Sequence, residues 1–173
     1  DNPDREIKEG DKFGYNYNIF VNKYQGFAGY SVVKGGFAAV LSADIEGTSM
    51  EREGLMRNGR AAEYSKGKSG QAWFLGGGGK LNLSYTAGNH IFGIAGGYES
   101  QAPVSYNSFV AARIQNNFVN NLTNEQILTA QASWQWRFGR VSGKFTGFYT
   151  KNWDVTQQNV AYLDNGSTST FSY

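Results

Sequence analysis

Several residue types that usually mark an enzyme site or a soluble domain are absent or scarce in this sequence of 173 residues. It contains no cysteine, which excludes disulfides, thiol nucleophiles and cysteine metal ligands. It has a single histidine, His90, so a metal site with several histidine ligands is excluded too. Charged residues make up 17%, whereas ordinary soluble domains carry about 25%. The formal net charge of +2 is too small to predict a nucleic-acid partner.

Long apolar runs are also missing, so the sequence predicts no transmembrane helix. The mean hydropathy of −0.50 would suit a soluble protein, but a membrane barrel can share it because alternate residues face water. Proline occurs twice, whereas glycine occurs 23 times and aromatic residues reach 16%. This balance is typical of antiparallel β-structure with one face in lipid.

The main pattern is an alternation of apolar and polar residues with a period of two, which indicates β-strands. From Phe37 to Ile45 the odd positions are apolar, whereas the even positions become polar toward Glu46. The same alternation occurs at 80–85, 128–138 and 141–150, and more weakly at 92–98. A helix would scatter these apolar sets around its circumference, so the sequence predicts strands.

The predicted connections alternate between short turns and long polar stretches. The short turns are expected at Lys34–Gly36, Ala87–Asn89 and Gly139–Arg140. The long polar stretches are expected at Met50–Gly70, Gln101–Asn124 and Asn152–Ser169. Transmembrane barrels show this asymmetry, with short periplasmic turns and long extracellular loops.

The predicted strands are long, which disfavours a soluble β-sandwich with strands of about 3–10 residues. One strand is expected over Gly14–Val33, with a bulge near Asn22–Tyr24 where the apolar phase slips. Aromatic residues gather at both ends of the strands, as in the two girdles of a membrane barrel. One group flanks the short turns: Tyr30, Phe37, Tyr85, Phe92, Trp136 and Phe138. The other lies toward the long loops: Tyr15, Tyr17, Tyr98, Tyr149 and Trp153.

Other site chemistries find little support in the sequence. The glycine run Gly76–Gly79 lacks the Ser or Thr and the following helix of a phosphate loop, so we expect it to allow bending or close contact. His90 lies beside a short turn and is expected to be an interfacial polar residue. The acidic residues show no EF-hand spacing, and the asparagine-rich stretch Gln115–Asn124 suits either a polar loop or a carbohydrate surface.

Four stretches resemble the barrel region of TonB-dependent receptors from Bacteroidetes-type bacteria. DNPDREIKEGDKFGYNY at 1–17 looks like that family's extracellular entry into a long strand. REGLMRNGRAAEYSKGKS at 52–69 is similar to one of its loops, and the residues at 122–156 resemble the strand pair that follows a second loop. YESQAPVSYNSFVAARIQNN at 98–117 resembles that second loop. It departs from the family pattern at Gln101, Ala111, Ala112 and Gln115.

The resemblance implies an all-β fold, an antiparallel transmembrane β-barrel of roughly 22 strands in the bacterial outer membrane. This chain would supply about six or seven neighbouring long strands of that single domain. The chain begins at Asp1 without a methionine or a signal peptide, and Tyr173 falls inside a predicted strand. We therefore expect the plug domain and the remaining strands to lie outside it.

The implied function is nutrient import, driven by the TonB complex through the plug, with no enzymatic activity and no cofactor. Expected partners are membrane lipid, the plug and remaining strands, and a surface lipoprotein or larger complex. The residues expected to contact a ligand are Arg57, Asn58, Arg60, Tyr64, Arg113, Asn116 and Asn117. Those expected to face the lumen are Lys80, Gln131, Gln135, Arg137 and Lys144. The alternatives are a plugless barrel in secretion or a structural role, and an enzyme barrel, which the lone His90 disfavours.

Overall fold

A computed structural model describes residues 6–162 and 168–172 of the chain. Within these ranges the chain forms strands and one short 3-10 helix, and it contains no α-helix. None of the described residues forms a helix long and apolar enough to cross a membrane. The elements are β1 (Tyr17–Lys34), β2 (Phe37–Gly54), η1 (Gly59–Ala61), β3 (Gly67–Ala87), β4 (His90–Gln101), β5 (Glu125–Phe138), β6 (Val141–Trp153), β7 (Gln158–Tyr162) and β8 (Thr168–Ser172).

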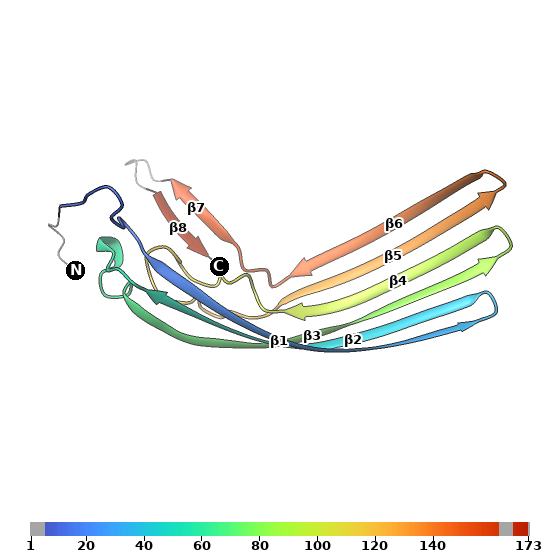
Figure 1. The fold of residues 1–173 in the computed structure, drawn as a ribbon, viewed down its shortest axis with the longest axis horizontal. Helices are drawn as coiled ribbons and strands as arrows, with labels where there is room; N and C mark the ends of the chain where they lie inside the picture. Colours follow the sequence, from blue (N-terminus) through green and yellow to red (C-terminus); the bar gives the residue numbers. More distant parts are fainter. Residues whose placement is uncertain (1–5, 163–167, 173) are drawn as a thin grey trace.

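The first six strands form one antiparallel sheet in which every strand pairs with its neighbour in sequence. The sheet is open, with β1 and β6 at its two edges, and it curves along its length (Figure 1). Strands β7 and β8 form a separate two-stranded sheet. The expectation of an all-β, antiparallel fold is therefore confirmed.

The three predicted short turns are confirmed, and they lie together at one end of the sheet (Figure 1). They join β1 to β2, β3 to β4 and β5 to β6 through two residues each. Each begins with a glycine of positive φ: Gly35 at 61°, Gly88 at 58° and Gly139 at 56°. Glycine enters this backbone region without the steric cost that a Cβ imposes. The long connections 55–66 and 102–124 lie at the opposite end.

Two predicted boundaries need correction at the long connections. The stretch Met50–Gly70 is shorter as a loop than expected, because β2 continues to Gly54 and β3 begins at Gly67. The stretch Asn152–Ser169 is not one loop, because it contains all of β7 and the start of β8. Residues 163–167 of this stretch lie outside the described residues. The prediction that Tyr173 lies in a strand falls outside them too.

The bulge predicted near Asn22–Tyr24 is wrong. Strand β1 pairs with β2 without interruption along its whole length, and the irregular register lies instead between Glu51 and Glu53, against β3. The apolar residues of β1 change from one face to the other for another reason. Near its loop end, β1 places Ile19 opposite Arg52, on the face that the long loop 102–124 covers. The positions of the apolar residues in β1 therefore depend on which face the loop covers, whereas the backbone pairing of β1 with β2 is regular throughout.

The sheet has one apolar face and one polar face. Register places a row of aromatic side chains directly opposite one another across five strands, on what we call the apolar face: Phe37, Tyr85, Phe92, Trp134 and Phe145. Side chains of this face are open to the surroundings, with Leu41 at 55% and Ile94 at 58% exposure. The opposite, polar face carries Ser, Thr, Asn, Gln and charged residues along β2 to β6. An exposed apolar surface that extends across five strands is unusual on a soluble monomer.

Strand β3 crosses the middle of the sheet through the glycine run Gly76–Gly79. A Cβ at Gly76 would lie 2.3 Å from the Ser100 carbonyl oxygen, and one at Gly77 would lie 2.4 Å from that of Asp44. Only glycine fits where the neighbouring backbones approach this closely. The run lies inside a strand and no helix follows it, and the expected role in close contact is confirmed.

Candidate functional site

The two long connections meet over the loop end of the polar face, and the largest fully buried side chains among the described residues lie in this loop cluster and in the strand end beneath it. Phe109 and Ala112 are fully buried, and the ring of Phe109 stacks on that of Phe118 at a centroid distance of 4.5 Å. Ser108 Oγ lies 3.6 Å from Met50 Sδ on β2, and also donates to the Val104 carbonyl. The loop 102–124 is therefore anchored to the sheet.

Arg52 of β2 lies at the centre of this cluster and is 1% exposed. Its Nε donates to the Ala112 carbonyl oxygen at 2.6 Å, and its Nη1 donates to the Ser65 carbonyl at 3.2 Å and to Asn116 Oδ1. The guanidinium carbon lies 4.7 Å from the centroid of the Tyr17 ring. One side chain thus ties β1 and both long connections to β2.

The Arg52 guanidinium has no carboxylate partner among the described residues, and neutral groups compensate its charge. Burial lowers the pKa of Arg52, and the nearby Tyr17 opposes this shift. Burial also raises the pKa of the Tyr17 phenol, so that ring stays neutral under the cation. Carbonyl dipoles and an aromatic face stabilise a buried cation without requiring a second buried charge.

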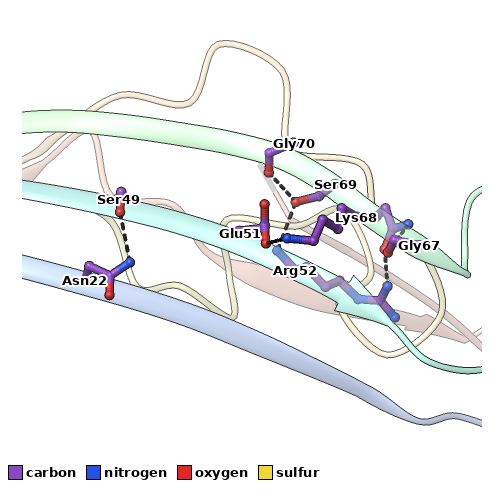
Figure 2. A network of polar contacts seen from close by, with 9 residues as sticks. Asn22, Ser49, Glu51, Arg52, Gly67, Lys68, Ser69 and Gly70 are labelled. Carbon is purple, nitrogen blue, oxygen red and sulfur yellow. Dashed lines mark hydrogen bonds and ion pairs between the residues drawn. The ribbon is translucent and has the colours of Figure 1, made fainter.

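The strand ends beneath the cluster are joined by further polar contacts, which Figure 2 shows. The Arg52 amide donates to Ser69 Oγ at 2.9 Å, and Lys68 Nζ lies 2.8 Å from Glu51 Oε1. Gly54 makes this packing possible, because a Cβ there would lie 1.7 Å from the Ser65 carbonyl oxygen. Because Gly54 has no side chain, the 55–66 connection can pack directly against the end of β2.

Two of the predicted ligand-contact residues hold the loops together. Asn116 is 8% exposed, and its Nδ2 donates to the carbonyls of Gly67 at 3.0 Å and Lys66 at 3.4 Å. Asn58 caps η1 by accepting from the Arg60 amide at 3.0 Å, and its Nδ2 donates to the Gly14 carbonyl at 2.7 Å. The fold therefore uses both asparagine side chains internally.

The other predicted ligand-contact residues lie on the exposed side of the cluster. They are Arg57, Arg60, Tyr64, Arg113 and Asn117. The guanidinium of Arg113 lies 5.6 Å from the centroid of the Tyr15 ring, whose neighbour is Tyr17 at 6.1 Å. The structure thus brings an exposed Arg–Tyr pair next to the pair formed by buried Arg52 and half-buried Tyr17.

The residues predicted to face a lumen all lie on the polar face. Register places Gln135 opposite Lys144, and Lys80 opposite Gly97 and hence in line with Thr129. Lys80 Nζ lies 3.3 Å from Glu99 Oε2, so its charge is balanced on the same face. Lys80 and Gln131 line a shallow hollow with Asn82, Thr129 and Phe148. Gln135 and Arg137 continue this face toward the turns.

The sequence did not single out Arg52 or Tyr17 as organising residues, nor Glu125 as a buried carboxylate. Arg52 belongs to the motif quoted for the loop, but only the fold shows that its partners lie 13 to 64 residues away. Glu125 at the start of β5 is 7% exposed, and its Oε1 has no hydrogen-bond partner among the described residues. No group of three or more His, Asp or Glu side chains suited to a metal ion occurs in the described part of the chain.

We compared the chain with models of protein families, with curated protein sequences and with solved structures, and none of these comparisons found a match.

Proposed function

We propose that this chain forms part of the wall of a transmembrane β-barrel in a bacterial outer membrane, belonging to a TonB-dependent receptor that imports a nutrient. The observation that carries the proposal is the two-faced sheet with all described hairpin turns at one end and the long connections at the other. Outer-membrane barrels have the same asymmetry, with lipid on one face of the wall and water on the other.

The open edges support a wall segment rather than a finished sheet. Neither β1 nor β6 has a partner along its outer edge among the described strands. In hydrocarbon each unpaired backbone donor or acceptor costs several kcal/mol, so a membrane wall must close on itself. The proposal therefore places further strands of the same protein beside β1 and β6.

The polar face suits the inside of such a wall. Its charges form pairs near the middle of the sheet, where Lys23 Nζ lies 2.6 Å from Glu46 Oε2 in addition to the Lys80–Glu99 pair. Neutral hydrogen-bonding groups such as Asn82 fill the space between them. Such a surface can bind a plug or water without attracting counter-ions strongly. The anchored loop cluster would then hold the exposed Arg113–Tyr15 pair at the outer mouth.

The absence of cysteine allows a sharp test of the two faces. Leu81 and Asn82 are adjacent and exposed, and they lie on the apolar and polar faces respectively. In a full-length protein without other cysteines, L81C carrying a fluorophore should be quenched by spin-labelled lipid. N82C should instead react with a membrane-impermeant maleimide. The same response at both positions would refute a membrane wall.

The rival is a plugless barrel in secretion or in a structural role, which would share the two faces. The loop resemblance at 52–69 and 98–117 supports the receptor instead. Conductance in planar bilayers separates the two, because a plugged receptor should be closed at rest and a plugless barrel should conduct steadily. Mass spectrometry of the purified protein should also find peptides of a plug domain.

A further inference from the structure

The half of the sheet next to the hairpin turns has an uneven charge. Residues 27–43, 81–97 and 130–148 contain no Asp or Glu. They contain four basic residues, which are Lys34, Arg137, Arg140 and Lys144. The ion pairs of the described residues all lie outside this half or at its border, and none includes these four. The turn end therefore carries positive charge that nothing in the described chain balances.

The charged groups are placed where a partner could reach them. Lys34 ends β1 and Arg140 lies in the turn between β5 and β6, and both side chains are exposed. Arg137 and Lys144 are exposed on the polar face of the same end. The remaining turn is followed by His90, the first residue of β4. Each of the three turns therefore contains a Lys, Arg or His residue or lies directly beside one.

His90 is held in an aromatic cluster on the apolar face. The Trp134 indole Nε1 donates to His90 Nδ1 at 3.1 Å. The His90 ring stacks on Trp134 at 5.9 Å and meets the edge of Phe138 at 5.4 Å, measured between centroids. Phe145 stacks on Trp134 at 6.3 Å and extends the cluster to β6. Aromatic rings beside a polar edge favour the interface between hydrocarbon and headgroups.

We propose that this turn end binds anionic phospholipid headgroups, with Lys34 and Arg140 contacting the phosphates and the His90–Phe138 pair seated at the level of the acyl ester groups. The inference rests on the proposed function, and it names the lipid class that the wall selects on its turn side. Charge complementarity supports it, because exposed cations without local carboxylates attract an anionic membrane surface. The adjoining aromatic cluster favours a lipid over an acidic soluble protein, since contact with such a protein would not require exposed aromatic rings beside the cations.

The test is lipid binding by the full-length protein in detergent, followed by native mass spectrometry with phosphatidylglycerol or with zwitterionic phosphatidylethanolamine. The wild type should prefer phosphatidylglycerol, and the double variant K34Q/R140Q should lose affinity for it by roughly 25-fold at low salt, at about fivefold for each charge. The matched control is K151Q, which removes an exposed cation at the loop end of β6 and should change little.

Three results would overturn the inference. They are equal affinity of the wild type for the two lipids, an undiminished preference in K34Q/R140Q, and a loss in K151Q as large as in the double variant. Binding of an acidic peptide by a protein that shows no lipid preference would assign the charge to a protein partner instead. The L81C and N82C labelling separates the failures: correct labelling without lipid preference refutes only this inference, whereas incorrect labelling refutes the membrane wall itself.

Discussion

Replacing Ala132 with arginine tests where the membrane lies along the sheet. Ala132 is exposed on the apolar face of β5, opposite Ile94 on β4 and Gly147 on β6. It precedes Phe138, the last residue of β5, by six positions, or about 20 Å along the strand. With a strand tilt of about 40°, this places it roughly 15 Å above the turns, close to the middle of a 30 Å hydrocarbon core.

If the apolar face is the lipid face of a barrel wall, as proposed, an arginine at this depth should destabilise the folded protein by roughly 2–4 kcal/mol. This corresponds to about a 30- to 700-fold change in the unfolding equilibrium. The matched control is the neighbouring Gln131, which is exposed on the polar face opposite Ala95 and Phe148. Because its side chain would face water in the proposed lumen, Q131R should stay within about 0.5 kcal/mol of the wild type.

The measurement is reversible unfolding of the full-length protein in lipid vesicles with guanidinium, followed by tryptophan fluorescence. A132R should lower the midpoint clearly, and Q131R should not. Equal midpoints for the two variants would refute the assignment of the apolar face to lipid. A larger loss for Q131R would mean that the polar face is the one packed against an apolar environment.

Three further predictions concern the loop end and the middle of the sheet. An epitope tag at Arg60 should bind antibody on intact cells and one at Asn89 should not; the reverse pattern would invert the topology. R52M should cost roughly 2–4 kcal/mol, because three buried acceptors lose their donor, and should expose both long connections to protease. R60M serves as its exposed control, and equal cleavage of the two variants would contradict the role of Arg52. G76A should destabilise the sheet because of the Ser100 carbonyl, whereas G47A, with open space around it, should be tolerated; equal midpoints in the guanidinium titration would contradict this difference.

The hairpins could be predicted because their signals are local. A two-residue turn such as that beginning at Gly139 is specified by a glycine between two alternating segments, and the strands then pair from the turn outward. Alternation also fixes which side chains share a face, since a slip of one residue would reverse every side chain. For this reason Gln135 and Arg137 could be assigned to the same face as Lys144 from the sequence alone.

The loop cluster could not be predicted in the same way, because it depends on contacts between distant parts of the chain. Asn116 was chosen as a ligand contact for its polar side chain in a long loop, yet it bonds to Arg52 and Gly67, from other elements. The predicted bulge in β1 failed for a related reason. The slip in its apolar pattern arises because Ile19 and Tyr17 share the face on which Arg52 bonds to the loop, and no local window of sequence can reveal that contact.

The buried hydrogen bonds of Arg52 affect both the charge of the exposed loop surface and the entropy that this surface loses on binding a partner. Because Arg52 bonds to carbonyls and an amide, its positive charge is stabilised but not neutralised. The exposed guanidinium of Arg113, stacked on Tyr15, lies on the same cluster and adds a second positive charge. Hydrogen bonds that hold the loops in place also reduce the entropy lost when such a surface orders around a partner. In the proposed receptor, this aromatic and cationic loop surface should therefore select the ligand, whereas the polar face of the sheet would only have to let it pass.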